Sequence, residues 1–211
     1  MNQKERARKI VDELARCYPD AKPMLNFSTP YELLVAVILS AQCTDERVNK
    51  VTSVLFENYN TPEKLITLSQ DELEIYIKSC GLYKNKAKHI LSATKDIIEK
   101  FSGQVPSDFE SLLTLDGVGR KTANVVYSVA FSGDAIAVDT HVFRVAKRLG
   151  LSKGKNPDQV ENDLCKVIDK SLWSKSHHYL IFHGRKVCKA INPNCSACKV
   201  ESLCKKVGVK K

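Results

Sequence analysis

An unbroken apolar segment near the N-terminus constrains the fold of this 211-residue chain more than any other feature. It follows a strong helix-start signal, in which Thr29 can cap the helix, Pro30 suits its first position and Glu32 completes a capping box. Residues 33–39 are then apolar on every side, and polar side chains return only at 40–42. Because a helix that is apolar all round is stable only when other elements surround it, the sequence predicts a buried central helix.

Helical periodicity or helix-start signals recur along the rest of the chain. The clearest amphipathic helix is predicted at 84–101, and the helix before it is predicted to end at Gly81, in a left-handed cap. No segment alternates as a β-strand does and no internal repeat is present, so we predict an all-α fold with short loops. The other predicted helices lie at 4–18, after Thr44, after Thr61, at 69–80, from Ser107, and at 120–131, 140–149, 157–169 and 174–187.

The charge balance favours a polyanionic partner, with a formal net charge of +9 and a pI of about 9.1. A basic surface that binds no ligand is an alternative that charge alone leaves open. The charged N-terminus lacks the apolar stretch of a signal peptide, and the longest apolar run falls well short of the ~20 residues that cross a membrane. We therefore expect a cytoplasmic protein, nucleoid-associated in a bacterium, with no membrane partner.

Four of the eight cysteines, Cys188, Cys195, Cys198 and Cys204, lie within the 17 residues 188–204. Four thiolates this close in sequence can surround one metal centre, and both zinc and a [4Fe-4S] cluster use four cysteines. Zinc sites usually pair two close-spaced knuckles, whereas only one CxxC occurs here, which favours a cluster and leaves zinc open. The other cysteines are predicted to be small buried apolar groups in helices: Cys17, Cys43, Cys80 and Cys165.

The segment 115–119, LDGVG, is predicted to join two helices. Gly117 and Gly119 permit positive φ and close approach of another backbone. The N–H groups that open helix 120–131 have no intrahelical partner, so a phosphate there would meet free donors, with Arg120 and Thr122 nearby. Such a contact positions a nucleic acid without reading its sequence. An ordinary connection between two helices is the alternative.

Lys121 and Asp139 form a candidate catalytic pair. A neutral lysine amine can attack a sugar C1′ and form a Schiff base. The carboxylate can stabilise positive charge on the sugar ring or take a proton from the lysine. Each residue also has a simpler interpretation, because Asp139 is an ideal helix N-cap and Lys121 suits a phosphate contact. The residues by themselves support nucleic-acid binding better than catalysis.

Taken together, the motifs resemble the endonuclease III family of helix–hairpin–helix DNA glycosylases. The resemblance covers nearly the whole chain, and its motifs are specific in combination. They are LDGVGRKTANVV (115–126), AVDTHVFRV (137–145), ELLVAVILSAQCTD (32–45), GLYKNKAKHI (81–90), IFHGRKVC (181–188) and the C-x6-C-x2-C-x5-C tail.

This resemblance implies two helical domains with a DNA-binding cleft between them. One is a six-helix barrel at 22–133 that contains the helix–hairpin–helix motif. The other combines 1–21 with 134–211 and carries a [4Fe-4S] cluster on the four tail cysteines. The implied activity is removal of oxidised pyrimidines from duplex DNA, followed by strand cleavage through β-elimination. The implied partner is double-stranded DNA with a damaged base or an abasic site, bound by a monomer.

The resemblance also implies roles for individual residues. Lys121 matches the Schiff-base lysine of the family, and Asp139 matches its essential aspartate. Gln42 and Leu82 match residues that fill the gap left by the flipped nucleotide, which suits a polar amide and an apolar wedge. Three further residues match positions that line the pocket or its rim: His141, Arg144 and Asp45.

Two departures from the family pattern stand out. The family hairpin usually reads Leu-Pro-Gly-Val-Gly, whereas Asp116 replaces the proline here. A carboxylate near a phosphate repels it and the turn loses rigidity, so we predict weaker or more salt-sensitive DNA binding than an Asp116→Pro variant shows. Equal affinities of the two proteins across a salt titration would contradict this. In addition, the loop 189–194 has Lys189 as its single basic residue, which weakens the case for a phosphate contact there.

Two other interpretations remain open at this point. A monofunctional glycosylase of the same superfamily, such as an adenine-mismatch enzyme, would lack the lysine, so Lys121 counts against it. A DNA-binding or redox-sensing iron–sulfur protein without enzymatic activity would be unaffected by loss of Lys121.

Overall fold

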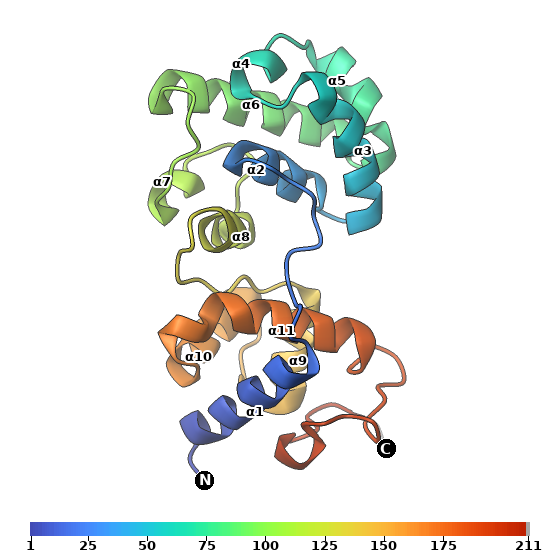
Figure 1. Ribbon diagram of the computed structural model, residues 1–211, viewed down its shortest axis with the longest axis vertical. Coiled ribbons are helices and arrows are strands. Elements are labelled where there is room, and N and C mark those ends of the chain that lie inside the picture. Colours follow the sequence, from blue (N-terminus) through green and yellow to red (C-terminus); the bar gives the residue numbers. More distant parts are fainter. Residues whose placement is uncertain (210–211) are drawn as a thin grey trace. The chain divides into compact units, whose positions relative to one another are not determined.

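The computed structural model describes residues 1–209, and within this range it contains helices and turns but no strand (Figure 1). The predicted all-α fold is therefore confirmed. The chain divides into two compact units, one formed by Pro23–Ser132 and the other by Met1–Lys22 together with the chain from Gly133 onward. No helix in the described range combines the length and apolar character that crossing a membrane requires.

Helix α2 (Pro30–Leu39) is the centre of the 23–132 unit. Every residue of α2 after Pro30 is buried, because α3 (Asp45–Asn58), α6 (Tyr83–Phe101) and α8 (Arg120–Ala130) all contact it (Figure 1). The predicted buried central helix is confirmed. The shorter elements of this unit pack around the same core: α4 (Pro62–Leu65), α5 (Gln70–Ile77), the 3-10 turn η1 (Lys78–Cys80) and α7 (Phe109–Leu113).

Three local predictions differ from the structure. Thr29 caps α2 as expected, but the Glu32 carboxylate accepts the N–H of Ser28, so the predicted capping box does not close. Helix α7 is capped by Asp108, one residue later than expected, because its carboxylate accepts the Ser111 N–H at 2.8 Å. Gly81 has a positive φ of 67° with an extended ψ of 158°, and the left-handed residue is the next one along the chain.

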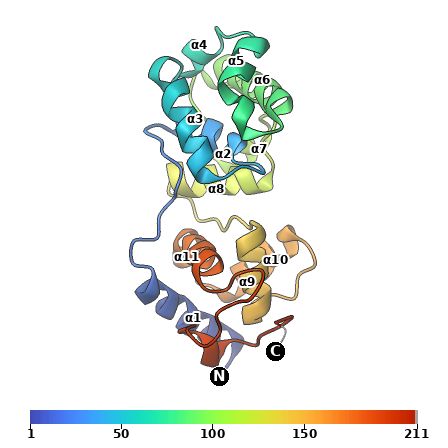
Figure 2. The same cartoon turned by 90° about the vertical axis from the view of Figure 1, so that its right-hand side faces the viewer.

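The second unit combines the N-terminal helix with the C-terminal part of the chain (Figure 2). Helix α1 (Gln3–Cys17) buries one apolar face, and it contacts α10 (Pro157–Val167) and α11 (Trp173–Lys186). The remaining helix, α9 (Thr140–Leu149), packs on both α10 and α11. Two 3-10 turns complete the unit: η2 (Lys170–Leu172) and η3 (Glu201–Leu203).

A buried arginine connects α1 to the end of the chain. Arg6 is 8% exposed, and its guanidinium donates to the carbonyls of Leu149 at 2.7 Å, Gly150 at 2.6 Å and Leu203 at 2.9 Å. Three carbonyls at the ends of α9 and η3, where helical partners run out, accept hydrogen bonds in this way. The N-terminal helix thereby helps to hold the cysteine-rich tail in place.

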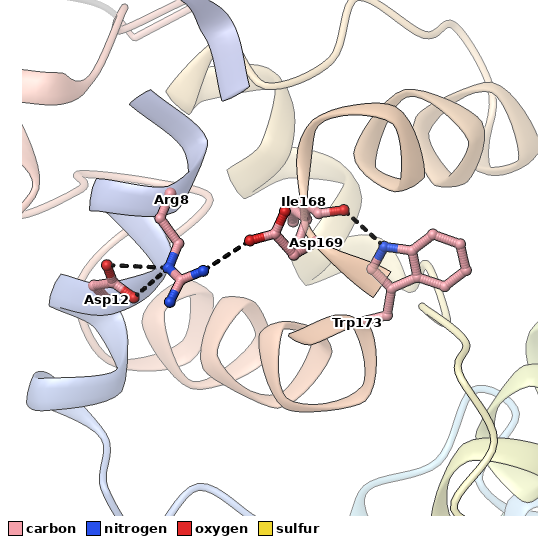
Figure 3. Close-up of polar contacts among 5 residues, drawn as sticks. All are labelled: Arg8, Asp12, Ile168, Asp169 and Trp173. Carbon is pink, nitrogen blue, oxygen red and sulfur yellow. Dashed lines mark hydrogen bonds and ion pairs between the residues drawn. The ribbon is translucent and has the colours of Figure 1, made fainter. Parts of the chain in front are cut away.

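Polar contacts on the surface place α1 against the turn between α10 and α11 (Figure 3). Arg8 pairs with Asp12 on its own helix at 3.0 Å and with Asp169 of the turn at 2.7 Å. The Trp173 indole closes the same turn by donating to the Ile168 carbonyl at 2.9 Å. Because Arg8 and its partners are about half exposed, these ion pairs contribute little to stability and act mainly on the position of α1.

Candidate nucleic-acid interface and metal centre

The glycine hairpin between α7 and α8 is anchored by two buried side chains. Leu115 and Val118 point into the core of the 23–132 unit, and the Val118 N–H donates to the Leu115 carbonyl at 3.1 Å. Gly117 has a φ of +73°, and a Cβ there would lie 2.6 Å from the Cβ of His89 on α6. Both the backbone conformation and the lack of space therefore require glycine at 117.

The N-terminus of α8 is open to a ligand. Its N-cap is Gly119, which offers no side chain to the first N–H groups, and a Cβ added at Gly119 would have no neighbour within 4 Å. Arg120 lies over the Phe109 ring at 5.3 Å. Lys121 is exposed and Thr122 is half-buried. The hairpin thus presents backbone donors beside a lysine and an arginine, which is an arrangement suited to an anion.

Asp139 caps α9, as the simpler interpretation of the sequence predicts. Its Oδ1 accepts the Val142 N–H at 2.7 Å, and the side chain is half-buried at the end of the buried segment 135–138. A carboxylate held by a cap is already oriented, so the capping role does not exclude a catalytic one. Lys121 belongs to the 23–132 unit and Asp139 to the other unit. Their joint catalytic role stays a prediction.

Gln42 and Leu82 are both exposed, and both have a left-handed backbone. Their φ angles are 55° and 48°, and the Leu82 side chain is 55% exposed. A positive φ is unfavourable for residues other than glycine, by about 1–2 kcal/mol, and an exposed leucine gains nothing from burial in the free protein. The two residues predicted to enter the duplex are therefore the strained and exposed residues of their loops.

His141 and Arg144 lie on the first two turns of α9 and interact with each other. The Arg144 guanidinium is 3.1 Å from His141 Nδ1 and donates to the carbonyls of Gly184 at 3.0 Å and Cys188 at 3.1 Å. Burial lowers the pKa of His141, while the Asp139 carboxylate opposes this shift. Arg144 thus connects α9 to the start of the cysteine tail, and the proposed DNA contact of either residue stays a prediction.

The four tail cysteines line one cavity in the second unit. Cys188, Cys195, Cys198 and Cys204 surround it together with Arg148, which is one turn after Arg144 on α9. The Arg148 guanidinium lies 3.6 Å from Cys188 Sγ and donates to two carbonyls of the loop that follows, and its own carbonyl accepts from Cys204 Sγ at 3.3 Å. The sequence analysis missed Arg148, although its i+4 spacing from Arg144 was a usable signal.

Burial sets the protonation of the groups around this cavity. Burial raises the pKa of the thiols of Cys198 and Cys204, so in the absence of a metal both keep their protons at neutral pH. His183 is buried between Tyr18 and the cavity, with Nδ1 3.0 Å from the Tyr18 hydroxyl and Nε2 3.5 Å from Cys198 Sγ. Burial lowers the pKa of His183 to about 4, so its ring is neutral beside the thiols.

Within residues 1–209, no group of three or more His, Cys, Asp or Glu side chains is arranged so that, as it stands, it could hold a single metal ion. In chemical type, the four thiols around one cavity suit a [4Fe-4S] cluster or a zinc ion, since both use four cysteines. The scattered cysteines do not all match the prediction of burial. Cys80 is buried, Cys43 and Cys165 are half-buried, and Cys17 is exposed because it occupies the last turn of α1.

Comparison with known proteins identifies the family. Residues 35–170 match the family model described as HhH-GPD superfamily base excision DNA repair protein. The chain is 52% identical to endonuclease III of Bacillus subtilis (strain 168) over 196 residues, which is 92% of this chain and 90% of that protein. The chain belongs to the endonuclease III family. Its identity to the Escherichia coli (strain K12) member is 46% over 204 residues, covering 97% of this chain and 96% of that one.

Solved structures of the endonuclease III family have the same fold. A trapped covalent intermediate of endonuclease III with DNA superposes with a TM-score of 0.93 at 51% identity, covering 98% of this chain and 97% of that chain. A non-covalent endonuclease III–DNA complex gives the same TM-score at 50% identity and the same coverage. A thermostable thymine-DNA glycosylase, at 22% identity and a TM-score of 0.79, shares the fold. The family predicted from the motifs is confirmed.

Proposed function

We propose that this chain is a bifunctional DNA glycosylase and abasic-site lyase of base excision repair, which removes oxidised pyrimidines from duplex DNA. One observation carries the proposal: Lys121 is exposed on the first turn of α8, beside the open hairpin. The family supports it, because endonuclease III of similar sequence has been trapped covalently on DNA. We also propose that the barrel predicted at 22–133 corresponds to the 23–132 unit and that the cluster domain corresponds to the other unit. We expect the protein to act as a monomer in the cytoplasm, associated with the nucleoid in a bacterium.

In the reaction, the neutral Lys121 amine attacks C1′ of the damaged nucleotide as the bond from C1′ to the base breaks. The base leaves with the electron pair of that bond, the nitrogen loses a proton, and the sugar ring opens to an imine. Loss of a C2′ proton then expels the 3′ phosphate by β-elimination, and water releases the enzyme. The Asp139 carboxylate stabilises the positive charge at C1′ and accepts the proton of the lysine.

The hairpin binds a phosphate through the N–H groups that open α8. We therefore expect substitutions at the two glycines to act on different properties, one on the stability of the protein and the other on DNA binding. Gly117→Ala should destabilise the protein by about 1–3 kcal/mol, because it combines a positive φ with a clash against His89. Gly119→Ala should cost about 1 kcal/mol or less, since the free protein has room for a methyl group there, but it should weaken DNA binding about tenfold or more.

Thermal unfolding and binding to a duplex at fixed ionic strength measure the two effects separately. If Gly119→Ala binds DNA as the parent does, no phosphate approaches the start of α8. If Gly117→Ala is as stable as the parent, the close contact with His89 is not a constraint.

The four thiolates of Cys188, Cys195, Cys198 and Cys204 would hold a [4Fe-4S] cluster, and the Arg148 guanidinium would offset its negative charge. Such a group, when bound, would link the chain just after α11 to tail residues 195–204 by covalent ligation, and the contacts of Arg148 would hold this assembly against α9.

We expect the purified protein to be brown, with broad visible absorption and about four iron atoms per chain. Cys198→Ala should lose the colour and the iron, whereas Cys17→Ala should keep both, because Cys17 is exposed and far along the chain from the tail. A colourless parent with one bound zinc ion would contradict the assignment.

The proposed activity is tested with the parent protein on a duplex that carries one oxidised pyrimidine. We expect release of the free base, strand cleavage, and a covalent adduct when borohydride is present, with none of these on an undamaged duplex. Base release without an adduct would indicate a monofunctional glycosylase. Binding with neither reaction would indicate a DNA-binding iron–sulfur protein.

A further inference from the structure

A buried lysine in the 23–132 unit has no part in the mechanism described above. Lys86 is on the first turn of α6 and is 4% exposed. Its ammonium donates to the Leu39 carbonyl at 2.8 Å and to the Cys80 carbonyl at 2.9 Å. The first carbonyl ends α2 and the second ends η1, so one side chain holds the C-terminal ends of two elements that are far apart in the sequence.

This position is costly for a cation. Burial lowers the pKa of Lys86, and the positive end of the α6 dipole lies in the same turn. The favourable terms are the negative end of the α2 dipole and the two carbonyls, which have no partner in their own helices. An apolar side chain of similar length would avoid the desolvation, so stability by itself does not account for a lysine here.

Each carbonyl that Lys86 binds lies just before one of the two strained loop residues. Gln42 follows Leu39 by three residues, Leu82 follows Cys80 by two, and both have positive φ. The loops also come close together, because Cys43, next to Gln42, lies near enough to the Cys80 thiol to contribute to its raised pKa, of which burial is the larger cause. The Lys86 ammonium therefore lies at the base of both loops, where it determines how far apart they begin.

We propose that Lys86 is a positioning residue that sets the spacing and direction of Gln42 and Leu82 for insertion into the DNA gap. This inference rests on the proposed function, because the gap arises when a nucleotide leaves the duplex. Gln42 and Leu82 can fill one gap together only if the spacing and direction of their side chains match it. A buried ammonium with two carbonyl acceptors provides a fixed point that an apolar contact, which is not directional, does not provide.

The proposal is tested by Lys86→Met, which keeps the length of the side chain and removes the donors. The matched control is Lys95→Met, which removes the same charge from the exposed side of α6. Binding is measured to a duplex with a stable abasic-site analogue and to the intact duplex. We expect Lys86→Met to lower the preference for the abasic duplex about tenfold, with intact-duplex affinity within about twofold of that of Lys95→Met.

A second test asks whether the effect of Lys86 depends on Gln42 and Leu82. Such a dependence distinguishes a positioning residue from one with a general structural role. In a Gln42→Ala/Leu82→Ala background, Lys86→Met should change the preference by less than about twofold, because its effect acts through those two side chains. Borohydride trapping on a single-stranded abasic oligonucleotide, which has no gap to fill, should remain within about twofold of the parent. Lys86→Gln keeps one donor group, its amide NH₂, so it should lower the preference for the abasic duplex in the same way but by a smaller factor. It provides a second variant if Lys86→Met folds poorly.

An unchanged preference in Lys86→Met or in Lys86→Gln overturns the proposal, as does an equal loss with and without Gln42 and Leu82. Reduced trapping on single-stranded DNA also overturns it, because the defect would then reach the chemistry at Lys121. A parent protein that does not distinguish abasic from intact duplex and forms no adduct overturns the proposed function itself, and this outcome is visible before any variant is made.

Discussion

Replacing Lys121 with glutamine is expected to abolish the covalent adduct with abasic DNA and to slow strand cleavage by about three orders of magnitude or more. The glutamine side chain is of similar length and can still donate to a phosphate. Its nitrogen lone pair is delocalised into the carbonyl, however, so it does not attack C1′. Because Lys121 is exposed on α8, the substitution should leave the thermal stability nearly unchanged. Borohydride trapping and single-turnover cleavage at saturating enzyme measure both effects.

Lys84→Gln is the matched control for this variant. Lys84 is exposed and is the second residue of α6, as Lys121 is the second residue of α8. The control removes one positive charge from an equivalent position in its helix, so it can weaken DNA binding, but it should retain the adduct at saturating enzyme. An adduct of normal yield in Lys121→Gln would place the nucleophile elsewhere in the chain.

Asp139→Asn is expected to slow base removal by roughly 10²–10⁴-fold while leaving α9 intact. Asparagine caps a helix about as well as aspartate does, and its side-chain oxygen can keep the 2.7 Å bond from the Val142 N–H. The substitution therefore removes the charge and the proton acceptor but preserves the cap. Base release on a damaged duplex, compared with the melting temperature of the same variant, separates the two roles.

Two further variants complete this test. Asp139→Ala should lose as much activity as Asp139→Asn and, in addition, about 1 kcal/mol of stability through the missing cap. Asp108→Asn changes another capping aspartate, which accepts the Ser111 N–H at 2.8 Å, and should leave activity intact. If Asp139→Asn is fully active and only Asp139→Ala is impaired, the carboxylate is a helix cap and nothing more.

Helix positions were largely predictable because the signals that start and stop a helix act within a few residues. Thr29 with Pro30 marks the start of α2, and the apolar residues after them predict its burial on every side. The errors occurred where two neighbouring residues competed for one role, as at Asp108, or where backbone strain decided the outcome, as at Leu82. A capping residue is chosen by hydrogen-bond geometry that composition does not specify.

The sequence by itself determined the all-α fold, the glycine hairpin and the family. Each of these depends on a local residue pattern or on a motif of consecutive residues, which can be recognised without the structure. Only the tertiary structure showed that Lys86 is buried, because its acceptors come from carbonyls 47 and 6 residues away. The same holds for Arg148, whose guanidinium reaches a cysteine 40 residues further along the chain. In a helical sequence a lysine or arginine is expected to be solvated, and only the packed ends of other helices can make one a structural cation.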